Sequence, residues 1–383
     1  PDWLGARDVK ALVLVDDTYV DGVAIGGTIG GVEIISAKAI TGDPAVGTQL
    51  LTIDAQIETQ LGDAIAALAQ SPLRNQIGPL ADWQYSGEAD AKLHLEIPLK
   101  QIPGKAITGD YLVNAKLRGG SVDIPNTPIS ISQLKGGLNF SVADGLYSED
   151  ITGEFWQQPL SAKLFRTSKQ QKVAISTAVE PESLSKLVKF PWAKVLTGTI
   201  PIEGLLSING ADAPGSGVTL QLVSQMEASE IMLPAPLTKV AGESRALDVT
   251  LHFDPDFQRL EGRIGDQLVT DLRFNQSQMT HGLVSFDRSV SVPEVGELLV
   301  AGYLPTTDLD LWNPVVALFS GSSESKATVW QPVFDLEFDY LNLATFKLEN
   351  IAAQIRLAEQ ATNIAFTSDL ADGKLVLPIG SSL

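Results

Sequence analysis

Apolar and polar residues alternate along most of this chain, a pattern typical of β-strands that bury one face and expose the other to solvent. In one such segment Leu93, Leu95 and Ile97 point to one side of the chain. His94 and Glu96 point to the other side. The pattern predicts a mostly β protein whose elongated, twisted antiparallel sheet is joined by turns.

The same alternation assigns an apolar side to every predicted strand. The positions on that side are Ala91, Leu93, Leu95, Ile97, Tyr111, Val113, Leu117, Leu138, Phe140, Val142, Leu206, Ile208, Leu220, Leu222, Leu247, Val249, Leu251, Phe253, Phe334, Leu336, Phe338, Ile355 and Leu357. Turns are predicted at Gly119-Gly120, Asp144-Gly145, Asp254-Pro255 and Asp372-Gly373, where turn-forming residues interrupt the alternation.

Helical periodicity is limited to residues 54–70, 181–189 and 311–319. A sheet of βαβ units would need a helix after nearly every strand, because parallel strands require long crossover connections. The scarcity of helices therefore favours antiparallel meanders with a few short helical inserts.

One internal repeat is suggested by residues that recur in the same order and at the same spacing. Pro125, Leu138, Gly153 and Phe165 correspond in this way to Pro234, Leu247, Gly262 and Phe274. We therefore expect one continuous series of repeated β-modules, approximately residues 1–80, 81–190, 191–300 and 301–383.

Composition narrows the classes of function. The chain has 27 basic and 46 acidic residues, so its net charge of −19 argues against a nucleic-acid partner. It has no cysteine, which excludes disulfides and thiolate chemistry. Apolar residues make up 44% of the chain, enough to bury a sizeable core.

The sequence begins at Pro1 and shows neither a charged-then-apolar leader nor a run of apolar residues long enough to cross a membrane. We therefore expect a segment of a longer chain. A membrane anchor would then belong to the rest of that chain.

The three histidines do not form a metal site in the sequence pattern. His94 and His252 fall on the polar side of predicted strands, and His281 is expected in a Thr-His-Gly turn. No His-Glu-x-x-His, phosphate-loop or nucleophile-elbow motif occurs. The glycine-rich residues 26–31 precede a predicted strand at residues 32–39, so a turn or bulge is expected there.

Two acidic pairs are candidate catalytic or calcium-binding groups. Asp254 and Asp256 follow a strand, and Asp308 and Asp310 lie on the outer face of another. Both chemistries need further groups at defined distances, so solvated charge is the favoured interpretation. The sequence predicts no catalytic residue, no metal and no cofactor, and hence a protein that is not an enzyme.

The apolar side itself is the remaining candidate site. In an ordinary β-sandwich it would be a closed core between two sheets. Here the one-sided pattern repeats over hundreds of residues with little sign of a second layer. A sheet that curls over its own apolar face forms a trough suited to acyl chains, because each buried methylene contributes about 0.8 kcal/mol.

Several stretches also carry a resemblance to a known family. They are residues 83–87 followed by 93–99, 122–125 with 134–140, 196–198 with 204–206, 302–304 with 308–312, and 372–378. In these strand and turn patterns the chain resembles the periplasmic part of the YhdP family. That AsmA-like family is grouped with TamB among the repeating β-groove, bridge-like lipid-transfer proteins.

The resemblance implies a segment of an inner-membrane-anchored protein of a Gram-negative bacterium. It implies that phospholipid moves along a hydrophobic groove in the periplasm, between the inner and outer membranes, without catalytic residues. The alternative is a structural or assembly scaffold of the cell envelope with a closed β core. A third hypothesis, a carbohydrate-active enzyme, would rest on Asp254 and Asp308.

Overall fold

The computed structural model describes residues 4–17, 19–41, 50–71, 74–99, 109–125, 129–167, 170–186, 194–209, 217–253, 258–275, 278–308, 310–312, 314, 330–343, 346–357 and 361–378. Within them the protein is mostly β, as predicted: 23 strands belong to a mixed sheet, and two more pair separately. The chain packs as two units. Unit 1 consists of Pro1–Thr177 with Leu205–Val218, and unit 2 of Ala178–Gly204 with Thr219–Leu383.

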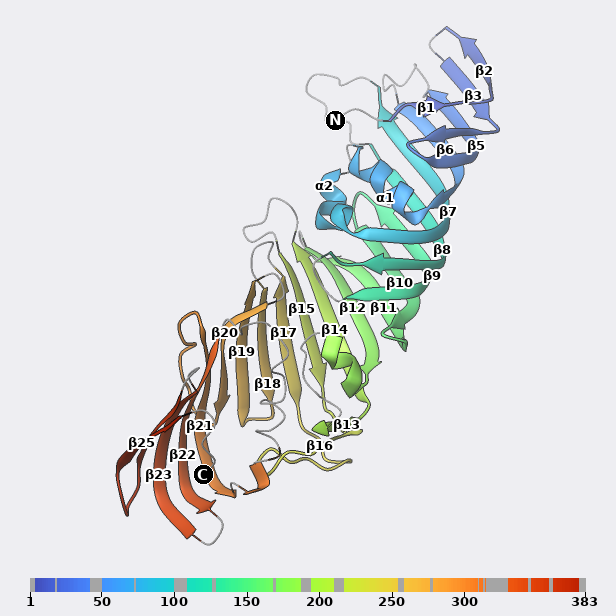
Figure 1. Cartoon of the computed structure of the whole chain (residues 1–383). Helices are drawn as coiled ribbons and strands as arrows, with labels where there is room; N and C mark the ends of the chain where they lie inside the picture. Colours follow the sequence, from blue (N-terminus) through green and yellow to red (C-terminus); the bar gives the residue numbers. More distant parts are fainter. Residues whose placement is uncertain are drawn as a thin grey trace. The chain divides into compact units, whose positions relative to one another are not determined.

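Unit 1 is built on an antiparallel series of strands (Figure 1). They are β1 (Ala6–Arg7), β2 (Ala11–Asp16), β3 (Tyr19–Ala24), β4 (Gly27–Ile29), β5 (Val32–Thr41), β6 (Leu50–Gln60), β7 (Gln84–Pro98), β8 (Tyr111–Asp123), β9 (Ser130–Ser141), β10 (Gly145–Phe155), β11 (Gln158–Thr167) and β12 (Gln170–Val179). From β5 to β12 each strand pairs with the next along the chain, and β3 pairs with β2 and β5.

Three short helical elements follow β6: α1 (Leu61–Ala69), α2 (Arg74–Ile77) and the 3-10 helix η2 (Gly78–Asp82). The predicted helix over residues 54–70 is correct only for its second half. Its first half is strand, because Ala55 and Ile57 pair with Leu93 and Ala91 of β7. Those residues fit both a helical and an alternating period, and pairing with β7 selects the strand.

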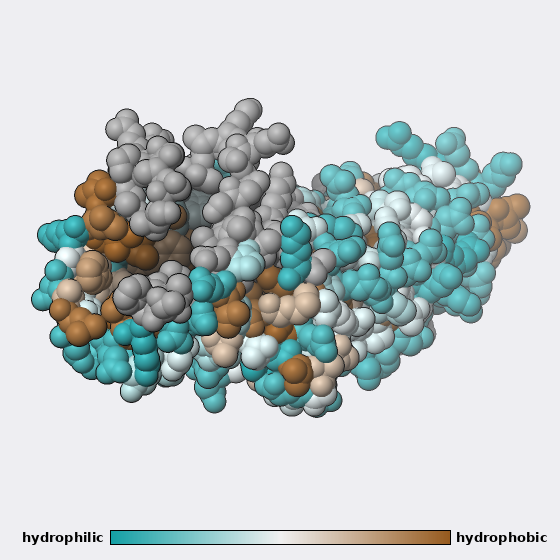
Figure 2. All heavy atoms as spheres, turned by 60° about the horizontal axis from the view of Figure 1, so that its bottom comes forward, coloured by the Kyte–Doolittle hydropathy of each residue, from teal (hydrophilic) through white to brown (hydrophobic). Residues whose placement is uncertain are grey.

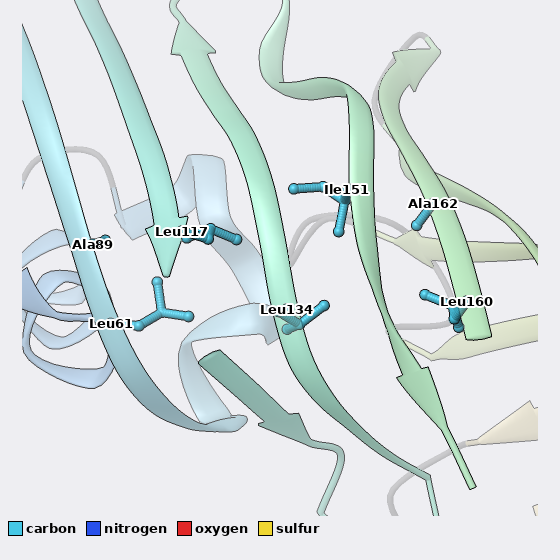
Figure 3. Packing of buried hydrophobic residues seen from close by; sticks show 7 residues of the cluster. All are labelled: Leu61, Ala89, Leu117, Leu134, Ile151, Leu160 and Ala162. Atoms are coloured by element: carbon cyan, nitrogen blue, oxygen red, sulfur yellow. The ribbon is translucent and has the colours of Figure 1, made fainter. Parts of the chain in front are cut away.

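The core of unit 1 lies between α1 and the strands beneath it. Figure 3 shows side chains from α1, β7, β8, β9, β10 and β11 converging on one side of the sheet. Leu61, Ala89, Leu117, Leu134, Ile151, Leu160 and Ala162 form this buried cluster. The helical insert therefore supplies a local second layer.

Unit 2 carries the remaining strands and a 3-10 helix, η3 (Pro181–Lys186). The strands are β13 (Leu196–Gly198), β14 (Ile200–Asn209), β15 (Val218–Ser224), β16 (Ser229–Ile231), β17 (Leu247–Phe253), β18 (Gln258–Ile264), β19 (Leu268–Asn275), β20 (Gln278–Phe286), β21 (Glu297–Asp308), β22 (Gln331–Leu343), β23 (Phe346–Leu357), β24 (Ala361–Thr367) and β25 (Gly373–Pro378). The boundary between the units falls within β14, after Gly204. β13 and β16 form the separate pair.

Two strand pairs of unit 2 are parallel, which differs from the antiparallel prediction. β20 pairs in parallel with β21, and β21 with β22, whereas β17–β20 and β22–β25 are antiparallel meanders. The reason is the length of the two connections, residues 287–296 and 309–330. Segments of that length allow the chain to return to the start of the previous strand.

One predicted turn is a bulge instead. Gly119-Gly120 lies inside β8, where the register with β9 shifts between Arg118 and Gly120. A Cβ on Gly87 of β7 would clash with the Cα of Gly120, so the two backbones approach more closely than side chains allow. Glycine on both strands permits this approach within the pair.

The other local predictions are partly confirmed. Asp144 lies in a turn before β10, Gly373 begins β25, and residues 32–39 are strand. His281 lies within β20 rather than in a turn, because Arg273 of β19 pairs with it. The Asp254-Pro255 turn, Asp256 and residues 187–189 and 315–319 of two predicted helices lie outside the described residues.

Candidate functional site

The predicted apolar side is a real, shared face in unit 1. Cross-strand partners point to the same side of a sheet, and Ile53 of β6 lies opposite Leu95 of β7, which lies opposite Tyr111 of β8. Val113 in turn lies opposite Phe140 of β9. We define the apolar face of unit 1 as Leu51, Ile53, Ala55, Ile57, Ala89, Ala91, Leu93, Leu95, Ile97, Tyr111, Val113, Ala115, Leu117, Leu138, Phe140, Leu160, Ala162, Leu164, Val173 and Ile175.

Burial along this face is uneven. Beneath α1, Ala89 is 3% exposed and Leu117 is 6% exposed. Further along the same two strands, Leu93, Leu95 and Val113 are only half-buried. The face therefore has a covered end and a partly open end.

A half-buried tyrosine links η2 to the covered end. The hydroxyl of Tyr85, at the start of β7, donates to the backbone carbonyl of Leu80 at 2.7 Å. Burial raises the pKa of this phenol, and the nearby Asp82 raises it further. Tyr85 stays neutral and holds the 3-10 helix against the sheet.

Most of the predicted positions between residues 138 and 222 also lie within strands. Leu206, Ile208 and Leu220 are buried in β14 and β15, and Leu222 is half-buried. Val142 is the exception, because β9 ends at Ser141. Val142 lies in the following turn and is 39% exposed, so it does not belong to the face.

Unit 2 has an apolar face of the same kind. Leu251 of β17 lies opposite Leu260, which lies opposite Leu272. At the other end of the unit Phe334 lies opposite Ile355, which lies opposite Ile364. We define the apolar face of unit 2 as Leu247, Val249, Leu251, Phe253, Leu260, Ile264, Leu268, Leu272, Val284, Phe286, Leu298, Val300, Leu304, Phe334, Leu336, Phe338, Ile351, Ala353, Ile355, Leu357, Ile364, Phe366, Leu375 and Leu377.

Alternation in the sequence identifies the β17, β22 and β23 positions of this face, as well as Leu375 and Leu377 of β25, but not those of β18–β21 and β24. The missed residues share the alternating phase of their neighbours, as Leu260, Val284 and Val300 illustrate. Glycine, threonine and charged residues shorten the apolar runs there, so cross-strand register was needed to join them.

Part of the unit 2 face is covered by the chain between β16 and β17. Leu237 of that segment is 8% exposed and packs with Phe286, Leu304, Phe338 and Ile351. By contrast, all the face residues on β17 are half-buried. Figure 2 shows hydrophobic residues gathered around a hollow in the left part of the view, where unit 2 lies.

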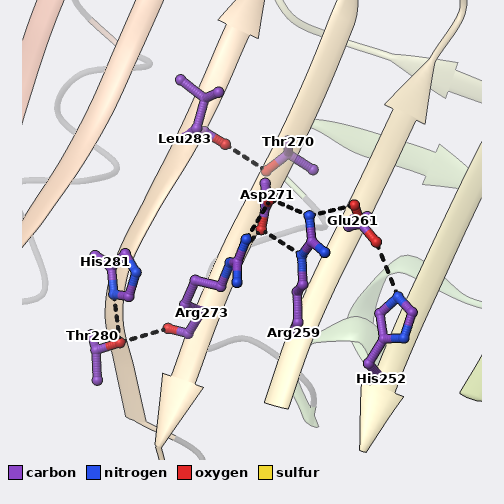
Figure 4. A network of polar contacts seen from close by, with 9 residues as sticks. All are labelled: His252, Arg259, Glu261, Thr270, Asp271, Arg273, Thr280, His281 and Leu283. Carbon is purple, nitrogen blue, oxygen red and sulfur yellow. Dashed lines mark hydrogen bonds and ion pairs between the residues drawn. The ribbon is translucent and has the colours of Figure 1, made fainter. Parts of the chain in front are cut away.

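The opposite face of β17–β20 is polar and internally paired (Figure 4). Asp271 accepts hydrogen bonds from Arg259 and Arg273, and Arg259 also contacts Glu261. Burial alone would raise the pKa of Asp271, but the two arginines outweigh it and lower the pKa. His252 contacts Glu261 at 3.0 Å. The two arginines and the two carboxylates therefore balance each other's charge on the outer face.

The other chemical candidates stay on polar surfaces. His94 contacts Asp54 at 2.7 Å on the outer face of unit 1, and this hydrogen bond raises the pKa of its imidazole. Asp308 accepts a hydrogen bond from the backbone N–H of Asp310. Among the described residues no group of three histidine or acidic side chains is placed to hold a metal ion. None of the helices in the described ranges has the length and apolar character of a membrane span.

The sequence of this chain is similar to that of known proteins. The family model described as YhdP protein matches residues 1–381. One relative, named intermembrane phospholipid transporter YhdP, from Escherichia coli strain K12, is 28% identical over 308 residues. The match covers 76% of this chain and 22% of that protein, so the chain spans about a fifth of its relative's length. No solved structure matches.

Proposed function

This chain belongs to the YhdP protein family, and from that premise we propose that it is a segment of an intermembrane phospholipid transporter. In this proposal the apolar faces of the two units bind acyl chains, while the headgroups stay in solvent at the edge of each face. The segment works in the periplasm of a Gram-negative bacterium, between the inner and outer membranes. The inner-membrane anchor belongs to another part of the protein.

The observation that carries the proposal is the half-burial of large aliphatic side chains that share one face over consecutive strands. Leu93, Leu95 and Val113 in unit 1 and Val249 and Leu251 in unit 2 all have this environment. A closed core buries such residues fully, and an ordinary soluble surface does not collect them on one face. Acyl chains would complete their burial.

In this proposal lipid binding is driven by the burial of apolar surface alone. Each methylene removed from water contributes about 0.8 kcal/mol, and the aliphatic lining makes no headgroup-specific contact. A lipid therefore gains a similar free energy at successive strands and can move between them without a covalent step. Such a segment needs no catalytic residue, cofactor or metal.

The test is lipid retention by variants with a charge on the apolar face. The purified 383-residue chain is loaded with phosphatidylglycerol, freed of excess lipid and analysed by native mass spectrometry. Leu93→Asp and Leu251→Asp should each lose most of the retained lipid, because a carboxylate among acyl chains is strongly unfavourable.

The same strands provide matched controls. Lys92→Asp and Thr250→Asp place the same charge one residue away, on the opposite face. Both controls should retain lipid as the unmodified chain does. Circular dichroism establishes that every variant is folded. Normal retention by folded Leu93→Asp and Leu251→Asp would rule out the proposal, and a lipid-free unmodified chain would favour the closed-core scaffold.

A further inference from the structure

The segment between β16 and β17 covers part of the apolar face of unit 2 with two leucines. We call this segment, residues 232–246, the strap. Leu233 of the strap packs against the same buried cluster that contains Leu237. Leu237 is 8% exposed and packs with one face residue from each of β20, β21, β22 and β23, namely Phe286, Leu304, Phe338 and Ile351.

The strap keeps its shape through hydrogen bonds with itself and with the adjacent β16. Lys239 is 1% exposed, and its ammonium donates to the backbone carbonyls of Ser229 and Val240 at 2.6 and 3.2 Å. The backbones of Lys239 and Ile231 exchange two further hydrogen bonds. A buried ammonium needs such acceptors, so Lys239 fixes the strap internally.

The rest of the strap is bonded in the same way. The guanidinium of Arg245 donates to the carbonyls of Leu237 and Thr238 at 3.0 and 2.9 Å. The backbone N–H of Met232 donates to the carbonyl of Val195, just before β13. Among the hydrogen bonds of the described residues, none joins the strap to β20, β21, β22 or β23. Apolar contacts therefore hold the described strap on these four strands.

The cover of unit 1 is attached differently. There Tyr85 of β7 donates a hydrogen bond to Leu80 of η2, so lifting the helical insert would break a polar contact with the sheet. Lifting the strap of unit 2 breaks only apolar contacts with the strands it covers. Because such contacts are non-directional, another apolar group can replace them without leaving a buried donor or acceptor unpaired.

We propose that the surface beneath Leu233 and Leu237 is an acyl-chain binding site, which the strap occupies when no lipid is bound. The inference rests on the proposed lipid-binding function and adds a site to it. About four acyl methylenes carry as much apolar surface as one leucine side chain, so a lipid can compete with the strap. The half-buried Val284 and Val300 border this surface and join it to the open part of the face.

The strap thus gives the covered residues two roles. In the lipid-free chain they pack with the strap and contribute to folding. When lipid displaces the strap, the same residues become binding surface. The strap and the lipid compete for one surface, so each lowers the occupancy of the other.

The experiment measures the exposure of position 237 with and without lipid. The chain contains no cysteine, so Leu237→Cys introduces a single thiol, whose reaction with a water-soluble maleimide is followed by mass spectrometry. The labelling rate follows the fraction of protein in which the strap is displaced. Loading with phosphatidylglycerol should raise this rate at least about tenfold, because lipid bound beneath the strap excludes the closed state.

Two variants serve as controls, and circular dichroism establishes that each is folded. Val240→Cys lies in the strap at a position that is 64% exposed and should react rapidly with and without lipid. Leu61→Cys lies in the cover of unit 1 and should react slowly in both cases.

An unchanged labelling rate of Leu237→Cys in the lipid-loaded protein would overturn the inference while leaving the proposed function intact. An equal acceleration of Leu61→Cys would indicate a general loosening of the chain and would also overturn it. Failure of the unmodified chain to retain phosphatidylglycerol would defeat both proposals.

A second measurement uses the competition itself. Leu237→Ala weakens the contact of the strap with the face and should raise the affinity for phosphatidylglycerol at least about threefold, because the binding surface is then free for a larger fraction of the time. Met232→Ala shortens a side chain of the strap that is 48% exposed and should leave the affinity unchanged. Unaltered or weaker binding by a folded Leu237→Ala variant would mean that the strap is only structural.

Discussion

The two ends of the apolar face in unit 1 differ although they lie on the same strands. On β7, Ala89 is 3% exposed beneath α1, whereas Leu93 and Leu95 are half-buried. On β8, Leu117 is 6% exposed and Val113 is half-buried. Alternation is the same at both ends, so what differs is the presence of a second layer.

This difference distinguishes the positions that determine stability from the positions available for lipid binding. A side chain under α1 has already gained its burial free energy from the protein, and a substitution there acts on folding. A half-buried side chain still has apolar surface to remove from water, so a substitution there acts mainly on the ligand. The same argument distinguishes Phe338, which is 8% exposed within the core of unit 2, from the half-buried Val249.

The strongest test of this comparison is one substitution made at both ends. Leu117→Asp places a carboxylate in the covered cluster and should destabilise unit 1 by about 4 kcal/mol or more. Leu93→Asp should cost much less, because its side chain already reaches solvent. Urea unfolding followed by circular dichroism measures both. Equal losses of stability would mean that the two ends do not differ.

The second test removes part of the cover. Leu61 is the buried residue of α1, and Leu61→Ala should cost about 2–4 kcal/mol through the cavity it leaves against Ala89 and Leu117. Hydrogen exchange of the β7 and β8 amides beneath α1 should become faster. Ala66→Ser, at an exposed position of the same helix, should change neither quantity. Unchanged exchange in Leu61→Ala would show that α1 is not the stabilising layer.

Strand positions were predictable from the sequence because alternation is a local signal. The predicted apolar positions Leu247, Val249, Leu251 and Phe253 all lie within β17. The predictions were wrong where the structure depends on contacts between residues far apart in the sequence. The Gly119-Gly120 bulge depends on Gly87 in the neighbouring strand, and the parallel pairing of β21 with β20 and β22 is a contact between separate strands that local alternation does not specify.

The predicted site was less complete than the predicted fold for a related reason. Alternation identifies which side chains share a face, but it does not say what covers them. The cover over Phe338 comes from Leu237, about a hundred residues earlier in the chain.

The third test uses the polar face of unit 2, which should matter for stability alone. Asp271→Asn leaves Arg259 and Arg273 without their shared carboxylate and should cost about 1–3 kcal/mol at pH 7. Because the folded pKa of Asp271 is lowered from 3.8, its stabilisation is present above that value. It is lost as the pH falls through the lower folded pKa.

Urea unfolding at pH 7, 5 and 3 checks this expectation. The difference between the unmodified chain and Asp271→Asn should be similar at pH 7 and 5 and smaller at pH 3. Lipid retention should be the same in both proteins at pH 7. A loss of retention in the folded variant would mean that the polar face also takes part in binding.

The smallest effect is expected at His94, on the outer face opposite the open end. The hydrogen bond with Asp54 raises the pKa of this imidazole above its usual 6.5. Its stabilisation is therefore full below about pH 6.5 and is lost as the pH rises through the folded pKa. Asp54→Asn should reduce stability by a few tenths of a kcal/mol at pH 5.5, because the pair is exposed, and by less at pH 8.5. Urea unfolding at the two pH values measures the difference, and a larger effect at pH 8.5 would reverse the assigned sign.

Retention of phosphatidylglycerol by Asp54→Asn should remain unchanged, because Asp54 and His94 lie across the sheet from the acyl chains that Leu93 and Leu95 are proposed to bind.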